Sequence, residues 1–253
     1  MCLVVLAWQV DRDRPLLLVA NRDEMHARPT EPMAWWPAPR LLAGRDLVAG
    51  GTWLGVADRG RFGLVTNVRG AAAPAAAPSR GTLVPRFLAG TLSPTTFLES
   101  LAGEAGDYAG FNLLLGDDRE LAYLTNADRR GPRLLAAGIH GMSNGPLDAA
   151  WPKVRRSCER LAAQLSTAQR DAEELLEVLA DRTPAADVEL PDTGVGLATE
   201  RLLSAAFIVA PRYGTRSTSV LVLGRDAGAA LERTHRADGA VLGTRRFELP
   251  GRG

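Results

Sequence analysis

The chain has 253 residues and a formal net charge of +1, with 30 Lys and Arg residues against 29 Asp and Glu residues. This length suits one large domain with a substantial core, and we expect a single domain over residues 1–253. The near-cancellation of charge argues against a nucleic-acid or anionic-membrane footprint. The 2 cysteines cannot form a disulfide framework. They fit a reducing cytosol, so we expect a cytoplasmic protein.

Membrane and metal signals are weak in this sequence. No apolar stretch approaches the roughly 18 residues of a membrane span, and the N-terminal run has no positive region before it that would mark a secretory signal. The 3 histidines, His26, His140 and His235, occur without an HExxH motif. We therefore expect no membrane span and no metal site.

The most informative stretch is the N-terminus, where Cys2 follows Met1 and begins the apolar run 2–8. Removal of Met1 would give Cys2 both a thiol, with a pKa of about 8.5, and an α-amine, with a pKa of about 7.7–8.0. Such an amine can take the thiol proton near neutral pH. The run predicts a strand buried on both faces. The alternative is an ordinary core-facing cysteine at a chain end.

Residues 2–10 and 16–20 predict two paired strands. The second strand is followed by Asn21-Arg22-Asp23-Glu24, which could form a solvated turn. In an antiparallel hairpin, however, the end of the second strand lies beside the start of the first. These four polar residues are therefore expected near Cys2.

The rest of the chain predicts alternating groups of strands and helices. The segment 27–46 is Pro-rich, carries Trp35 and Trp36, and receives no regular element. The elements expected after it are a hairpin of 50–57 and 61–67, helices at 80–89 and 94–103, strands at 110–116 and 120–125, a hairpin at 133–142, helices at 149–165 and 170–181, and strands at 205–210, 216–223, 228–236 and 241–248. Continuously apolar strands without βαβ alternation predict an α+β fold, a four-layer αββα sandwich of two mainly antiparallel sheets with helices outside. Cys158 falls on the apolar stripe of its helix and is expected to be a core thiol.

Acyl transfer through a thiol needs a nucleophile, a base, donors for the oxyanion and charges that orient the reactants. Asn67 and Asn144 each end a predicted strand or hairpin, so an amide N–H at either could bind an oxyanion. Asp23 could hold an α-ammonium, and Arg22 and Arg216 could fix the amine, the thiol or a substrate carboxylate. Taken singly, each of these residues is also an ordinary turn former or solvated charge.

A set of short motifs along the chain resembles the NRDE family, which is named after the tetrapeptide and includes the Transport and Golgi Organisation protein 2 of animals. The motifs are Cys2, Asn21-Arg22-Asp23-Glu24, Gly51-Thr52-Trp53-Leu54-Gly55, Thr66-Asn67, Ser79-Arg80-Gly81, Ser143-Asn144, Trp151-Pro152-Lys153 and Arg216-Ser217-Thr218. The resemblance spans nearly the whole chain.

That family in turn resembles the N-terminal-nucleophile hydrolases, in the branch of conjugated bile-acid hydrolases and penicillin V acylases. The resemblance implies the αββα sandwich, with Cys2 as nucleophile and Arg22 and Asp23 near the amine. It also implies site roles for Asn67, Asn144 and Arg216. In the acylase branch two residues separate the arginine from the aspartate, whereas here the two are adjacent. On alternating strand positions they would point opposite ways, leaving a place that Glu24 or Asn21 could fill.

The function expected from these features is a cytosolic cysteine amidohydrolase that cleaves a small non-peptide or acyl amide and needs no cofactor. Trp53, Arg22, Asn21 and Glu24 are the candidates for substrate binding. The alternative follows from the association of animal family members with haem and lipid handling. The same cleft, walled by tryptophans, would then belong to a non-catalytic carrier or chaperone, with Cys2 or a histidine as axial haem ligand.

Overall fold

The computed structural model describes residues 2–57, 60–71, 73–128, 130–165 and 171–251. The chain divides into two compact units, one made of Met1–Ala27 with Ala137–Leu249 and the other of Arg28–Ala136 with Pro250–Gly253. Each unit is built on one sheet. The first unit therefore combines the N-terminal segment, which contains the predicted hairpin, with most of the C-terminal half of the chain.

The sheet of the first unit has six strands in the order β10-β1-β2-β11-β12-β13. Its strands are β1 (Cys2–Trp8), β2 (Leu16–Met25), β10 (Gly138–Met142), β11 (Tyr213–Leu223), β12 (Ala227–His235) and β13 (Val241–Pro250). The predicted hairpin is confirmed, because β1 pairs antiparallel with β2. Residues 3–8 of β1 are all buried, as their continuous apolar run predicted. β2 continues to Met25, so the NRDE tetrapeptide lies inside a strand and not in a solvated turn.

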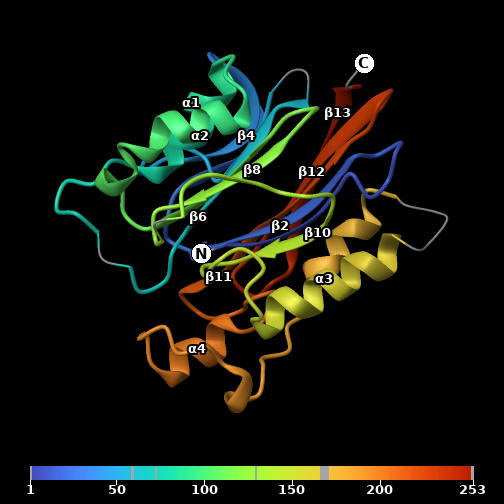
Figure 1. The fold of residues 1–253 in the computed structure, drawn as a ribbon. Coiled ribbons are helices and arrows are strands. Elements are labelled where there is room, and N and C mark those ends of the chain that lie inside the picture. Colours follow the sequence, from blue (N-terminus) through green and yellow to red (C-terminus); the bar gives the residue numbers. More distant parts are fainter. Residues whose placement is uncertain (1, 58–59, 72, 129, 166–170, 252–253) are drawn as a thin grey trace. The chain divides into compact units, whose positions relative to one another are not determined.

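Helices cover one face of this sheet. α3 (Pro152–Leu165) lies along it, as Figure 1 shows, and the 3₁₀ helix η4 (Glu174–Leu179) packs beside α3. Leu3 and Val5 of β1 form a core with Leu161 of α3. The helix predicted at 149–165 is confirmed, whereas the helix predicted at 170–181 is the shorter η4, and residue 170 lies outside the described residues.

Cys158 of α3 packs against this core, in agreement with the expected core thiol. Burial raises the pKa of its thiol to about 11. The structure adds two short elements that the sequence did not predict, the 3₁₀ helix η5 (Asp187–Glu189) and α4 (Leu197–Leu203). Both connect η4 to β11.

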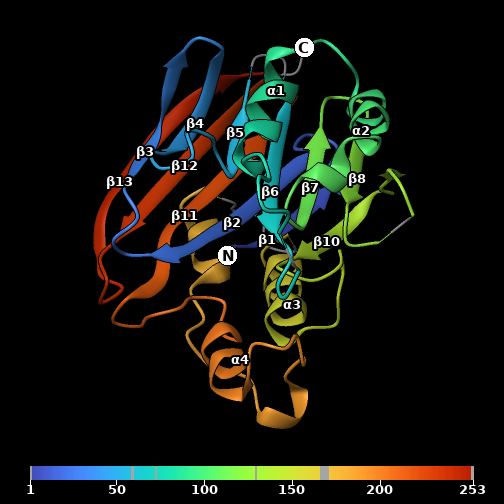
Figure 2. The same ribbon diagram turned by 90° about the vertical axis from the view of Figure 1, so that its left-hand side faces the viewer.

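The sheet of the second unit has seven strands in sequence order, β3 to β9, with neighbours antiparallel. Its elements are β3 (Thr30–Pro37), β4 (Arg40–Asp46), β5 (Leu54–Val56), β6 (Phe62–Asn67), η2 (Arg80–Thr82), α1 (Leu83–Ala89), α2 (Pro94–Ala102), η3 (Ala105–Asp107), β7 (Phe111–Gly116), β8 (Leu121–Thr125) and β9 (Arg133–Leu134). Figure 2 shows α1 over β5 and β6. Phe87 and Leu98 of the helices form the core with Val65 and Leu113 of the strands. The hairpin, helices and strands predicted between residues 50 and 125 are thus confirmed, although the turn at 58–59 lies outside the described residues.

Three segments differ from their sequence predictions. The Pro-rich segment 27–46 forms the hairpin β3-β4, and its prolines are tolerated because β3 is the edge strand of its sheet. Residues 133–142 are not a hairpin, since β9 pairs with β8 while β10 pairs with β1. Residues 205–210 form no named strand and have only the isolated bridge of Val209 with Gly214. That run is apolar because Phe207 and Ile208 are buried.

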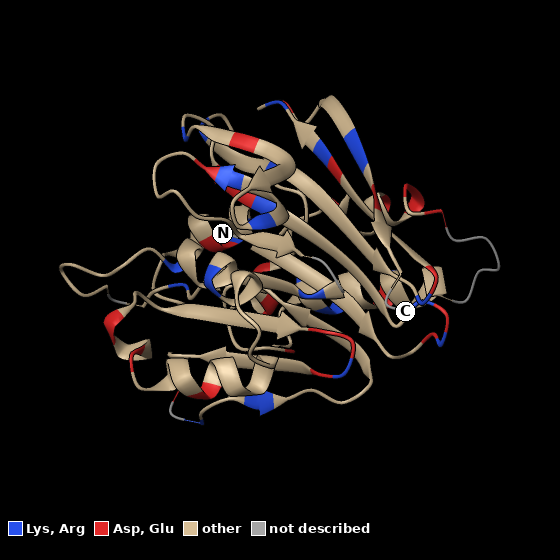
Figure 3. Cartoon of the chain, turned by 90° about the horizontal axis from the view of Figure 1, so that it is seen from above, with Lys and Arg blue, Asp and Glu red and all other residues tan. Residues whose placement is uncertain are grey.

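The α+β class with two antiparallel sheets is confirmed, and each sheet carries helices on one face. Charged residues lie mostly at strand ends and in connecting segments, as Figure 3 shows, and strand centres are largely uncharged. Arg22 and Asp23, at the NRDE end of β2, are buried, which is uncommon for charged residues and directs attention to that end of the sheet.

Candidate active site

Cys2 and Arg22 form the centre of the candidate site in the first unit. Cys2 is the first residue of β1, and Arg22 lies directly opposite it on β2. Residues that oppose each other in an antiparallel pair project their side chains from the same face of the sheet. The partly buried thiol and the buried guanidinium therefore share one face.

Asp23 follows Arg22 along the strand and so projects from the opposite face. Its side chain is only 1% exposed, and one carboxylate oxygen accepts a hydrogen bond of 2.7 Å from the Thr215 hydroxyl. Burial raises the pKa of Asp23, while the positive charge of Lys153, the bond from Thr215 and the charge of Arg22 oppose that rise. The adjacency of Arg22 and Asp23 thus places the two side chains on different faces, as the strand alternation predicted.

Both of these charges nevertheless act on the Cys2 thiol. Burial raises the pKa of the thiol, and the negative charge of Asp23 raises it further. The charge of Arg22 and a hydrogen bond from the Asp23 backbone N–H work in the opposite direction. A thiol with a raised pKa needs a base close by before it becomes a nucleophile. The Cys2 α-amine would be such a base, and Met1, whose removal would expose it, lies outside the described residues.

Arg216 reaches this end of the sheet through an irregularity in β11. The register of β11 against β2 shifts after Thr215, so that Arg216 is the extra residue of a β-bulge. Bulges re-aim side chains and are frequent next to active sites. Burial lowers the pKa of Arg216, the charge of Arg22 adds to that lowering, and Glu24 opposes it. Arg22, Glu24 and Arg216 therefore form one group of interacting charges.

Asn144 lies beside Cys2 on the other neighbour of β1. It follows β10 by two residues, and β10 pairs antiparallel with β1 up to Val4 and Met142. The adjoining Ser143 hydroxyl lies 3.0 Å from the Cys2 carbonyl oxygen, to which it donates a hydrogen bond. Asn144 is buried. The structure therefore brings Cys2, Arg22, Asp23, Asn144 and Arg216 to one end of one sheet.

Asn67 and Trp53, the other predicted site residues, belong to the second unit. Asn67 is the last residue of β6 and pairs in register with Phe111 of β7. Trp53 packs its ring over Gly44, where a Cβ would come within 2.3 Å of the ring. The packing explains why Gly44 must lack a side chain, and the site roles of Asn67 and Trp53 rest on the sequence alone.

Asn21 projects from the face of β2 opposite to that of Arg22, and its side chain forms three hydrogen bonds to other segments of the first unit. Its amide nitrogen donates to the carbonyl oxygens of Leu179, at 3.0 Å, and Ala206, at 2.8 Å. Its amide oxygen accepts from the Thr218 hydroxyl at 2.7 Å. Because that hydroxyl has one proton, His235 must donate its Nε2–H to Thr218 across the 3.1 Å that separate them. These contacts give the first residue of the NRDE tetrapeptide a structural role at the base of the site.

Sequence reasoning gave no role to Lys153 and Thr215, which both act on Asp23. Thr215 carried no sequence signal, because its position depends on the register of β11. Lys153 had one, since it is the only lysine in a chain whose other basic side chains are arginines. A unique residue of its type that is also buried is a candidate for a specific role.

The histidines show no arrangement for a metal. Among residues 2–57, 60–71, 73–128, 130–165 and 171–251, no group of three or more His, Cys, Asp or Glu side chains is placed to hold one. His26 Nε2 lies 3.0 Å from the Ala210 carbonyl oxygen, and His140 Nδ1 lies 2.9 Å from Asp148. The carrier alternative, in which Cys2 or a histidine binds haem, stays a prediction from the sequence. Within the described part of the chain, no helix has the length and apolarity needed to cross a membrane.

Solved structures with the same architecture define the class of the fold. The chain is similar to the N-acylethanolamine-hydrolyzing acid amidase (NAAA) ortholog of Caenorhabditis elegans, with a TM-score of 0.51 and 10% identity, covering 87% of this chain and 92% of that one. It is also similar to the C2A mutant of the conjugated bile acid hydrolase from Clostridium perfringens, with a TM-score of 0.53 and 8% identity over 99% and 92% of the two chains. At these identities the likeness shows the fold, which is that of the N-terminal-nucleophile hydrolases.

Sequence comparison identifies the family. The family model of Transport and Golgi organisation 2 matches residues 1–236. The Transport and Golgi organization protein 2 homolog of Bos taurus is 30% identical over 235 residues, and the match covers 83% of this chain and 83% of that one. The Homo sapiens homolog is 29% identical over 228 residues, with the same 83% coverage of both chains. The chain therefore belongs to the Transport and Golgi organisation 2 family, as the NRDE tetrapeptide implied.

The buried His235 predicts a pH-dependent stability of the first unit. Burial lowers the pKa of His235 from 6.5 to about 4, and its buried Nδ1 has no hydrogen-bond partner among the described residues. A group whose pKa is lowered by folding contributes stability above its unfolded pKa, and this is lost as the pH falls through the folded pKa. The melting temperature of the wild type should therefore fall more steeply between pH 6.5 and pH 4 than that of His235→Gln. Parallel melting curves across this range would contradict the assignment.

Proposed function

We propose that this protein is a cysteine N-terminal-nucleophile amidohydrolase that cleaves a small non-peptide or acyl amide. The observation that carries the proposal is the place of Cys2, second in the chain, opposite Arg22 and beside Asp23 and Asn144. The names of the structural neighbours support the substrate class. One is described as hydrolysing N-acylethanolamines and the other as a hydrolase of conjugated bile acids.

The first half-reaction would acylate Cys2. The free α-amine takes the thiol proton, and the thiolate attacks the substrate carbonyl carbon to form a C–S bond. Negative charge then develops on the carbonyl oxygen, where the amide N–H of Asn144 can donate to it. The C–N bond breaks as the oxyanion collapses, and the leaving amine takes its proton from the Cys2 ammonium. Asp23 favours that ammonium while it carries the proton.

The second half-reaction would release the acyl group. The α-amine, again neutral, takes a proton from water, and the oxygen attacks the thioester carbonyl. The C–S bond breaks, the carboxylic acid leaves, and the sulfur takes the proton back. The same residues thus serve both halves, and no cofactor enters either of them.

The charges around Cys2 suit a substrate with an anionic group. Arg22 and Arg216 supply two guanidinium groups, whereas Glu24 is the carboxylate that interacts with Arg216 on the same side. Guanidinium groups bind carboxylates through paired hydrogen bonds. Arg22 and Arg216 would therefore orient the substrate, and the sequence alone adds Asn67 as a second oxyanion donor.

A reducing compartment completes the proposal. Cys2 and Cys158 are both free thiols. A nucleophilic thiol is best kept active in the cytosol, where the glutathione and thioredoxin systems maintain thiols in the reduced state. The proposed enzyme would thus work as a cytosolic protein on a small-molecule substrate.

Replacing each cysteine in turn separates the nucleophile from the core thiol. Cys2→Ala should abolish hydrolysis of a panel of N-acyl amides and change the melting temperature little, because Cys2 is only partly buried at a strand end. Cys158→Ala is the matched control and should retain hydrolysis, because the Cys158 thiol, with a pKa of about 11, stays protonated at neutral pH. Activity that survives in Cys2→Ala would refute the proposed nucleophile.

Asn144 provides a kinetic test of oxyanion stabilisation. A contact made mainly in the transition state affects kcat and leaves KM nearly unchanged. Asn144→Ala should therefore lower kcat by about 10²- to 10³-fold. Steady-state rates on the best substrate of the panel measure the effect, and a variant with a raised KM and an unchanged kcat would show that Asn144 positions the substrate instead.

A further inference from the structure

Lys153 is buried to an extent that is unusual for its type. It lies in the first turn of α3 and is only 4% exposed. Lysine is almost never fully buried unless its charge is paired, since removing an ammonium from water is costly. The place of this side chain therefore needs a specific explanation.

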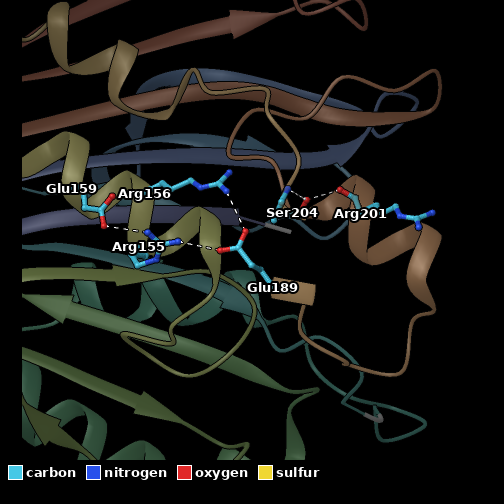
Figure 4. Close-up of polar contacts among 7 residues, drawn as sticks. Arg155, Arg156, Glu159, Glu189, Arg201 and Ser204 are labelled. Atoms are coloured by element: carbon cyan, nitrogen blue, oxygen red, sulfur yellow. Dashed lines mark hydrogen bonds and ion pairs between the residues drawn. The ribbon is translucent and has the colours of Figure 1, made fainter. Parts of the chain in front are cut away.

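The other basic residues near the start of α3 behave as ordinary surface charges. Arg155 and Arg156 both reach Glu189, at 3.4 Å and 3.5 Å, and Figure 4 draws these contacts. Lys153, in contrast, shares its helical stripe with Ser157 and Leu161, spaced by four residues and all buried. The lysine thus belongs to the stripe that faces the sheet.

Asp23 projects from the same side of that sheet. Leu161 packs in one cluster with Val19 of β2, so the helix-covered face carries the odd-numbered residues of this strand. Asn21 confirms the assignment, because it bonds to the carbonyl of Leu179 in η4. Asp23 follows on the same face. Lys153 also favours the Asp23 carboxylate more strongly than Arg22 does.

We propose that Lys153 is a positioning residue for the nucleophile, and that its ammonium shares the Asp23 carboxylate with the α-amine of Cys2. This inference rests on the proposed function in one respect, the free amine at Cys2. A carboxylate paired only with the α-ammonium would hold that proton tightly and make the amine a poor base. A second cation on the same carboxylate weakens this hold. The amine then remains able to accept the thiol proton near neutral pH.

Four charged side chains surround Cys2 and Asp23, namely Arg22, Glu24, Lys153 and Arg216. Arg22 acts on Cys2 and on Asp23, and Lys153 acts on Asp23. Arg216 and Glu24 interact with each other, and Arg216 also with Arg22. Of these cations Lys153 is the one buried under the helix on the Asp23 face. Its removal should therefore change the proton affinity of the Cys2 amine without removing a group that contacts the substrate carbonyl.

The test is the pH dependence of Cys2 alkylation by iodoacetamide, followed by peptide mass in protein whose Met1 removal has been verified. Lys153→Met should move the midpoint to higher pH by about 1 unit, because loss of a nearby like charge favours the ammonium and disfavours the thiolate. Lys153→Arg keeps the positive charge, so its midpoint should lie close to that of the wild type. Arg155→Met removes an exposed cation two residues from Lys153, which faces away from the Lys153 stripe, and should titrate like the wild type. A folded Lys153→Met protein with the wild-type midpoint would overturn the proposal.

A second variant keeps the test valid if Lys153→Met fails to fold. Lys153→Gln removes the same charge and keeps N–H donors that can bond to the buried Asp23 carboxylate. It should raise the midpoint as Lys153→Met does, and a folded Lys153→Gln protein with the wild-type midpoint would refute a role for Lys153. Alkylation needs no substrate, so absence of amide hydrolysis together with the predicted midpoints would refute the amidohydrolase and leave the Lys153 inference standing.

Discussion

The pairing of β1 with its two neighbours is the constraint on which the site depends. β2 places Arg22 opposite Cys2, and β10 delivers Ser143 and Asn144 to the same strand end. Backbone hydrogen bonds across both ladders hold β1 in place, and a slip of one residue would turn every side chain to the other face. The nucleophile is thus positioned by the core of the first unit, in which Leu3 and Val5 are fully buried.

The elements that the sequence predicted correctly are those whose signal is local. Apolar runs, turn residues and helical spacing identified the N-terminal hairpin, α3 and most of the second unit. The errors came from segments whose state depends on distant partners. Residues 133–142 resemble a hairpin, but β10 pairs with β1 at the start of the chain. Residues 205–210 have the apolar composition of a buried strand. Phe207 and Ile208 are indeed buried, but they lie in irregular chain and not in a strand.

The site was predictable in its residue types and less so in its geometry. The tetrapeptide and its distance from Cys2 indicated Arg22 and Asp23, and strand alternation correctly placed them on opposite faces. The bulge at Arg216 could not be predicted, because a register shift leaves no pattern in a single strand. The effect of Lys153 on Asp23 also depends on how α3 packs on the sheet. Arg216 and Lys153 are identified as site residues by their burial together with their charge interactions with Arg22 and Asp23.

The central claim is that the α-amine of Cys2 is the base that activates its own thiol. It is tested most directly by inserting one bulky residue between Met1 and Cys2, which aminopeptidase leaves unprocessed, and following acylation of Cys2 by intact mass. The account predicts that the processed wild type forms a thioester with an N-acyl amide substrate, while the folded insertion variant forms none. Equal acylation of the two proteins would show that another group is the base, and would contradict the account.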